Sequence, residues 1–155
     1  MSLPFRRSVV VGACLLIGVF AGMAGYTFQY AEGLSYFSND PGACANCHVM
    51  QDPYDSWLKS SHREAASCND CHVPHELVDK YLSKAVNGWN HSRHFTMQTF
   101  PDPIRIRPGN HEVLQENCIT CHEDMVHNLV EFDQKSATGT SLRCTACHGS
   151  VGHLQ

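Results

Sequence analysis

Four short segments of this chain each combine two thiols and an imidazole within five residues. All four read Cys-x-x-Cys-His, and they begin at residues 44, 68, 118 and 144. The chain has 155 residues, nine cysteines and eleven histidines, and only Cys14 lies outside the four segments, in an apolar run. Such regular use of two residue types indicates one kind of chemistry repeated four times.

Zinc, disulfides and haem are the three chemistries that cysteine-rich chains use, and the spacing separates them. Zinc sites combine pairs of Cys-x-x-Cys but leave the repeated histidine unexplained. Cysteines this close together rarely cross-link a fold. Covalent haem uses two thioethers and an axial histidine from one short turn. We therefore predict four covalently bound haem c groups on Cys44, Cys47, His48, Cys68, Cys71, His72, Cys118, Cys121, His122, Cys144, Cys147 and His148.

The first motif continues as CANCHVM, which places a second possible iron ligand, Met50, two residues after His48. The other motifs have Pro74, Asp124 and Ser150 at that position. Because two thioethers hold the turn on one face of the porphyrin, His48 and Met50 cannot both bind the iron. Either Met50 packs against the haem, or it displaces His48 and marks this haem as different.

The N-terminal region predicts a membrane anchor. Residues 8–30 carry no charge and are long enough to cross a hydrocarbon core of roughly 30 Å. Arg6 and Arg7 precede this run, so residues 1–7 are expected in the cytoplasm and the remainder outside. A cleaved signal peptide is the alternative, but its apolar region is usually shorter. We expect a single-pass protein of the bacterial inner membrane with its haem domain in the periplasm.

Residues 31–155 form the expected haem domain, roughly 125 residues around four porphyrins. So little protein cannot build a separate apolar core over each group, so the haems themselves should form the core. No alternating strand pattern is present. The predicted fold is mostly α with much irregular chain, with helices at about 52–62, 76–97 and 123–135. The net charge of −4 gives no indication of nucleic-acid binding.

Seven histidines lie outside the motifs, and some of them should be distal haem ligands. We choose His62, before the second motif, and His153, five residues after His148. Surface positions are the better interpretation for three others. The full set is His62, His75, His91, His94, His111, His127 and His153, of which the three surface histidines are His75, His111 and His127.

The helix expected at 76–97 has two distinct faces. Its apolar stripe consists of Leu77, Val78, Tyr81, Leu82, Ala85, Val86 and Trp89. Lys84 and His91 fall off this stripe and, being seven residues apart, share one face. An amphipathic helix that carries Trp beside an anchor could lie at the membrane interface, where Lys84 could bind a quinone oxygen and His91 could accept a proton. The alternative is a core-packing helix whose cations pair with haem propionates.

The anchor, the four motifs and the C-x-x-C-H-x-M form of the first one together resemble the NapC/NirT family of membrane-bound tetrahaem quinol dehydrogenases. The short length, the segment SSHREAASCNDCHVPH and the run FPDPIRI look most like the small subunits of cytochrome c nitrite reductase in this family. This resemblance covers nearly the whole chain.

The resemblance implies menaquinol oxidation at the first haem and delivery of electrons to a periplasmic pentahaem nitrite reductase that makes ammonium. Nitrite reduction would then take place on the partner of a hetero-oligomer. Another periplasmic reductase, for nitrate or trimethylamine oxide, or several partners, is the alternative. A terminal reductase lacks support from catalytic side chains, and a simple electron store would need neither the anchor nor the face with Lys84 and His91.

The resemblance also implies roles for single residues. Met50 would ligate the first haem and Lys84 would line the quinol site. His62 and His153 would serve the fourth and third haems, respectively. Some members carry aspartate where this chain has His91, so His91 is expected as either a proton acceptor or an iron ligand. The second haem, on His72, is then left for completion by a side chain of the partner.

Overall fold

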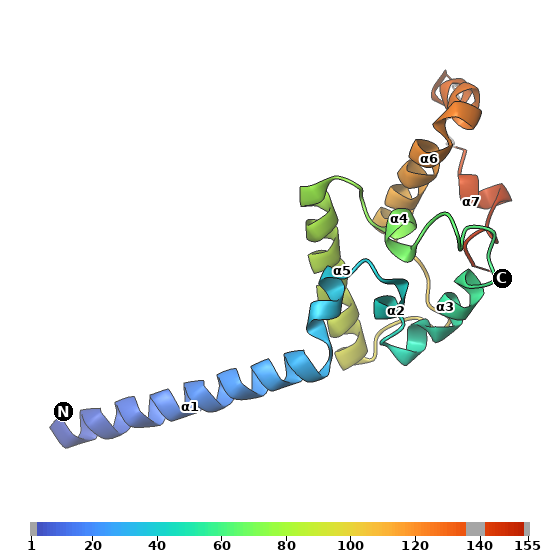
Figure 1. Ribbon diagram of the computed structural model, residues 1–155. Coiled ribbons are helices and arrows are strands. Elements are labelled where there is room, and N and C mark those ends of the chain that lie inside the picture. Colours follow the sequence, from blue (N-terminus) through green and yellow to red (C-terminus); the bar gives the residue numbers. More distant parts are fainter. Residues whose placement is uncertain (1–2, 136–141, 154–155) are drawn as a thin grey trace. The chain divides into compact units, whose positions relative to one another are not determined.

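The computed structural model describes residues 3–135 and 142–153, and the chain divides into two units, one up to Ser35 and one from Tyr36 onward. All regular elements in the described ranges are helical, as Figure 1 shows. The predicted helical class with much irregular chain is confirmed.

The first unit is dominated by α1, Leu3–Tyr30, a helix of 28 residues. Its length is about 42 Å at 1.5 Å per residue, which exceeds a hydrocarbon core of about 30 Å. Within Pro4–Tyr30 the mean hydropathy reaches 2.2, and none of the side chains in that apolar stretch is buried within the protein. Leu16 and Phe20, for example, are 74% and 77% exposed. A helix that is apolar all round and unburied fits a lipid environment, and it contains the predicted anchor.

The remaining elements are short helical turns and two long helices. In chain order they are η1 (Gly33–Phe37), α2 (Pro41–Cys44), η2 (His48–Met50), α3 (Gln51–Trp57), α4 (Cys68–His72), α5 (Leu77–Met97), α6 (Pro108–Lys135) and α7 (Cys144–Cys147). The short helix α4 packs against α6 (Figure 1).

The prediction for α5 is confirmed, whereas α3 ends earlier than predicted. Helix α5 begins after its N-cap, Glu76, and ends at Gln98, whose left-handed backbone (φ 50°) returns its N–H to the last turn. Helix α3 ends at Trp57, five residues before the predicted end at His62. The chain folds back there because the Trp57 indole donates to the Ala66 carbonyl at 3.0 Å.

The third predicted helix, 123–135, is wrong at its start, because α6 already begins at Pro108. The third Cys-x-x-Cys-His motif is itself helical, so the segments before and after it join. Only His122 departs from helical geometry, with φ −110° and ψ 17°. The helix is therefore kinked at the histidine of the motif.

The second unit has almost no apolar core of its own. Val73, 7% exposed, is the one buried hydrophobic residue among those described; Lys84 and Asn117 are the buried polar residues, at 8% and 7%. A domain of this size ordinarily buries many large apolar side chains. Because protein interiors are close-packed, something other than side chains must fill the space between the helices of this unit. Large apolar prosthetic groups fit that space.

Candidate functional site

Three of the four motifs place their cysteines on helical turns. The second motif is α4, the third lies within α6, and the fourth is α7 followed by His148 as its C-cap. Residues three apart on a helix share one face, so both sulfurs emerge on the same side. Ser67 caps the second motif through a capping box with Asp70. These turns fit the attachment of two thioethers and an adjacent imidazole to one porphyrin.

The first motif has a different backbone. Cys44 ends α2, and Cys47 is extended (φ −91°, ψ 122°) and caps η2, which runs from His48 to Met50. His48 is exposed and Met50 is half-buried. Because η2 turns the chain directly after Cys47, His48 does not continue a helix that carries both cysteines. The first motif therefore differs from the other three in the backbone that leads to its histidine.

The cysteine sulfurs of successive motifs lie close together. A hydrogen bond with Cys68 lowers the pKa of the Cys44 thiol to about 7, so the first and second motifs meet. Burial and then the nearby charges of Asp70 and Cys121 raise the pKa of Cys71, which places the second motif near the third. Burial and then Cys144 raise the pKa of Cys118, which joins the third motif to the fourth. The motifs therefore follow one another in space as they do in the sequence.

The two predicted distal histidines each lie against the histidine of a motif. The rings of His62 and His122 are centred 6.0 Å apart at an interplanar angle of 76°. The rings of His153 and His72 are also 6.0 Å apart, at 31°. Two imidazoles that share one metal have ring centres about 6 Å apart, since each metal–nitrogen bond is about 2 Å. Both contacts therefore have the spacing of an axial ligand pair.

These contacts differ from the pairing that the family resemblance implied. The His62 ring contacts His122 of the third motif, and its Nδ1 also lies 3.3 Å from the carbonyl of Val151, three residues after the histidine of the fourth motif. His153 lies beside the second motif instead of the third, with its Nδ1 3.0 Å from the Pro53 carbonyl. His72, predicted to lack a partner in the chain, thus has one in contact. Burial, and then His153, lower the pKa of His72 to about 4, which keeps it in the neutral form that binds metal.

None of the three histidines predicted at the surface contacts the histidine of a motif among the described residues. His75 is exposed and its Nε2 lies 3.0 Å from the Asp70 carbonyl. His111 Nδ1 accepts from the Arg143 guanidinium at 2.6 Å and its Nε2 lies 3.0 Å from Thr145 Oγ1. The latter contact holds the fourth motif to α6. His127 is exposed.

One face of α5 holds the short segment 36–39 beside the first motif. Tyr81, Lys84, Gly88 and His91 follow one another at spacings of three, four and three, so they form a single stripe. The rings of Tyr81 and Phe37 are centred 6.1 Å apart. The Lys84 ammonium donates to the Ser38 carbonyl at 2.7 Å and to Asn39 Oδ1 at 3.4 Å. We call these four positions of α5 the polar stripe.

Lys84 and His91, predicted to share a face, are thus brought to the same segment. An ammonium has three N–H donors, and two are used here, so one remains for a ligand. Burial, and then Lys80, lower the pKa of Lys84, while the nearby Cys44 acts in the opposite direction. Burial, followed by Arg107 and His94, lowers the pKa of His91. His91 is therefore neutral near pH 7 and able to accept a proton.

Sequence reasoning missed the partners of this face. Tyr36 Oη lies 3.1 Å from His91 Nδ1, and Asn69, inside the second motif, donates to both the Ser38 carbonyl and Asn39 Oδ1 at 3.2 Å. Burial raises the pKa of Tyr36, as do the neighbouring Cys47 and Cys44. No spacing rule could have found these contacts, because Tyr36 and His91 are 55 positions apart.

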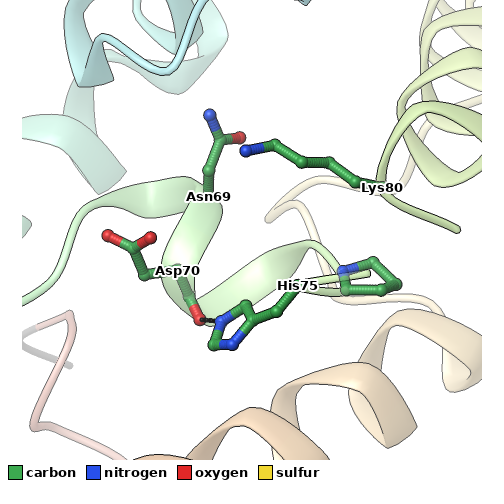
Figure 2. Close-up of a pocket in the computed structure, with 5 residues that line it drawn as sticks. Asn69, Asp70, His75 and Lys80 are labelled. Atoms are coloured by element: carbon green, nitrogen blue, oxygen red, sulfur yellow. Dashed lines mark hydrogen bonds between the residues drawn. The ribbon is translucent and has the colours of Figure 1, made fainter. Parts of the chain in front are cut away.

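A separate pocket of about 220 Å³ lies beside the second motif. Its lining residues are Asn69, Asp70, Pro74, His75 and Lys80. Figure 2 shows the side chains of Asn69 and Lys80 reaching toward each other across it. It contains none of the predicted haem ligands or quinol-site residues.

Comparisons with known proteins give consistent results. Residues 5–107 match the NapC/NirT cytochrome c family, N-terminal region, and residues 67–149 match the cytochrome c554 and c-prime family. The cytochrome c-type protein NrfH of Wolinella succinogenes is 40% identical over 154 residues, covering 95% of this chain and 87% of that protein. A chain in the crystal structure of the cytochrome c nitrite reductase NrfHA complex bound to the HQNO inhibitor matches with a TM-score of 0.59 and 29% identity, covering 94% of this chain and 90% of that one.

Proposed function

Since the chain belongs to the NapC/NirT cytochrome c family, we propose that it is a membrane-anchored quinol dehydrogenase that supplies electrons to a cytochrome c nitrite reductase. The solved relative is part of a nitrite reductase complex, which supports a hetero-oligomer in which nitrite is reduced on the partner. Menaquinol is the proposed electron donor and ammonium the product of the partner. The alternative, the same role for a nitrate or trimethylamine oxide reductase, differs only in the partner.

The chain is a c-type cytochrome and carries covalently bound haem c. We propose four such groups, one on each Cys-x-x-Cys-His segment, because the pattern occurs four times and the haem domain buries almost no apolar side chains of its own among the residues that the structure describes. Haem iron supplies one-electron transfer in each direction. The sulfur contacts from the first motif to the fourth support a relay that follows the order of the sequence.

Met50, His72, His122 and His148 are the proposed proximal iron ligands, and His62 and His153 the distal ones. Met50 in place of His48 is supported by the extended backbone at Cys47 and by the partial burial of Met50. His62 and His153 are supported by their contacts with His122 and His72. His153 offers the second haem an axial ligand from within the chain.

The observation that carries the proposed function is the polar stripe beside the first motif. Oxidation of a quinol releases two electrons and two protons. The remaining donor of Lys84 would hydrogen-bond a quinol oxygen and stabilise the negative charge that develops as its proton leaves. His91, neutral because its pKa is lowered, would accept the two protons one after the other and pass each to water, while the two electrons would go one at a time to the haem of the first motif.

The apolar face of α5 would bring this site to the lipid. Leu77, Val78 and Trp89 are 70%, 75% and 71% exposed. An exposed apolar stripe on a helix next to a polar face is typical of an interfacial helix. We propose that residues 1–7 lie in the cytoplasm, residues 8–30 cross the inner membrane, and residues 31–155 lie in the periplasm, where the quinol enters from the bilayer.

The test is direct reduction of the full-length chain in detergent by a menaquinol analogue, followed by haem absorbance. We expect rapid reduction that HQNO inhibits, and reoxidation when the nitrite reductase and nitrite are added. No reduction of the wild-type chain would overturn the quinol role. Reduction without reoxidation by the nitrite reductase would favour another reductase as the partner.

A further inference from the structure

We propose that Tyr36 is a positioning residue of the quinol site, which holds the His91 imidazole through a hydrogen bond to Nδ1. The inference rests on the proposed function and adds a residue to it. The Tyr36 Oη and His91 Nδ1 atoms are 3.1 Å apart, and the two rings are centred 6.4 Å apart at 47°. The hydroxyl is the part of Tyr36 that touches His91.

The hydrogen bond gives the two ring nitrogens different roles. A neutral imidazole has one N–H donor and one acceptor nitrogen. When Nδ1–H donates to the Tyr36 oxygen, Nε2 carries the lone pair and is the atom that accepts a proton. The phenol oxygen of Tyr36 accepts this bond through its lone pairs. In this arrangement Tyr36 holds the orientation of the His91 ring and leaves Nε2 as the acceptor.

Gly88 allows Tyr36 to reach His91. A Cβ atom at position 88 would lie 3.3 Å from Tyr36 Cε1 and 3.4 Å from Cδ1, tighter than ordinary contact. The Tyr36 ring therefore lies on α5 at the place where the helix has no side chain, three residues before His91. Glycine in a helix interior is otherwise unfavourable by about 1 kcal/mol relative to alanine. The close approach of the ring gives a reason for its use here.

The neighbours of Tyr36 hold the segment in place without its hydroxyl. The Phe37 ring packs on Tyr81, and the Ser38 carbonyl accepts from Lys84. Replacement of Tyr36 by phenylalanine should therefore keep the backbone and remove only the bond to His91. The substitution separates positioning from folding.

The experiment measures oxidation of a menaquinol analogue by the full-length chain in detergent. For Tyr36→Phe we expect kcat to fall about tenfold with KM within about twofold of wild type, because the base is misplaced while binding is retained. In a His91→Ala background, Tyr36→Phe should have no further effect, because its partner is gone. Equal losses in both backgrounds, or wild-type kcat in Tyr36→Phe, would overturn the proposal.

Two alanine substitutions provide a matched pair. Gly88→Ala should displace the Tyr36 ring and lower kcat, whereas Gly109→Ala, in α6 with nothing within 4 Å of its Cβ, should leave kcat unchanged. Both substitutions raise helix propensity. An equal fall in kcat in the two variants would therefore indicate a cause other than Tyr36 and count against the proposal.

Structure determination of the wild type and of Tyr36→Phe gives a readout independent of turnover. We expect the phenyl ring at position 36 to remain over Gly88 and the His91 ring to leave its present orientation; an unchanged His91 would overturn the proposal. If the wild-type chain is not reduced by quinol at all while His91 still moves, the proposed function fails and the Tyr36–His91 contact stands.

Discussion

The first motif and the other three share a five-residue pattern but differ in backbone and surroundings. The second, third and fourth motifs lie on helical turns, and the histidines of the second and third contact a histidine from elsewhere in the chain. In the first motif the second cysteine is extended, a methionine follows two residues after the histidine, and the polar stripe of α5 lies nearby.

Under the proposed function, this difference would separate a site of chemistry from a path for electrons. Two imidazoles that face each other can hold one iron between them and leave no place for a substrate. A lysine donor and a neutral histidine beside one motif offer hydrogen bonding and proton acceptance instead. The same attachment pattern would then serve two purposes, and the protein around the motif would decide which.

The largest expected effect comes from removing the attachment of the first haem. In the double variant Cys44→Ala/Cys47→Ala, reduction by a menaquinol analogue should fall to the background rate, because quinol meets the relay there. Dithionite should still reduce the remaining haems. Haem absorbance and the mass of the purified chain check both results.

The matched control is Cys144→Ala/Cys147→Ala, which removes the fourth attachment. Quinol should still reduce this chain, while transfer to the nitrite reductase should fail. Wild-type quinol oxidation by the variant of the first motif would show that the two regions have been assigned the wrong way round.

The second prediction concerns the buried ammonium of the polar stripe. Lys84→Met keeps the aliphatic stem and removes the donor, so quinol oxidation should fall by about tenfold or more. The Ser38 carbonyl loses one of its two donors and keeps Asn69, so the free energy of unfolding should fall by about 1 kcal/mol. Initial rates and thermal unfolding measure the two effects.

Lys80→Met, one turn earlier on α5, is the control for the loss of a positive charge. Lys80 lines the pocket beside the second motif instead of the polar stripe (Figure 2). Its substitution should leave quinol oxidation within about twofold of wild type. Equal losses for Lys80→Met and Lys84→Met would indicate a general electrostatic effect.

Helix α5 illustrates what sequence periodicity can and cannot predict. The apolar stripe and the shared face of Lys84 and His91 follow from 3.6 residues per turn, and both are present. What the polar stripe contacts does not follow, because the partners of Lys84 and His91 lie 46 and 55 positions away. Local periodicity specifies a face, and only the tertiary fold supplies its partner.

The histidines show the same limit. The pattern of residues identified His62 and His153 as candidates, but each contacts a different motif from the one implied by family resemblance. Which motif a distal histidine reaches depends on the path of irregular chain, such as the turn after Trp57, and irregular chain has no periodic signal. The early start of α6 was missed for a related reason, because a haem motif was treated as an interruption although it is helical.

The third prediction tests distal ligation by His62. His62→Ala should convert one low-spin haem to a high-spin haem, visible by electron paramagnetic resonance, and slow transfer to the partner while leaving KM for quinol unchanged. The exposed His127→Ala is the control and should leave all spectra unchanged. A wild-type spectrum for His62→Ala would exclude it as a ligand.

The pairing of His62 can be read from a combined variant. When Cys118 and Cys121 are also replaced by alanine, the high-spin signal should vanish if His62 serves the third haem and persist if it serves the fourth. The contact with His122 predicts that it vanishes. Either result fixes which motif in the relay His62 completes.

The smallest expected effect on turnover comes from a buried amide that joins two motifs. Asn117 Nδ2 donates to the carbonyls of Cys71 and Val73 at 3.0 and 2.9 Å, which fixes the second motif to α6. Asn117→Ala leaves both buried carbonyls without this donor and should lower the free energy of unfolding by about 1–3 kcal/mol. Because the Asn117 amide bonds to two carbonyls of the second motif and to no residue of the polar stripe, kcat and KM for quinol should stay at wild-type values.

Asn110→Ala is the matched control, since Asn110 lies on the same helix and, among the described residues, donates to the Asn87 side chain at 3.1 Å instead of to a backbone carbonyl. The Asn87 side chain can turn to another donor, so the free energy of unfolding should fall by at most about 1 kcal/mol. Thermal unfolding of the two variants side by side measures the difference. Equal stability of the two variants would mean that the second motif is held by its haem and not by Asn117. A change in KM for quinol in Asn117→Ala would connect the relay to the quinol site and weaken the contrast between the two regions.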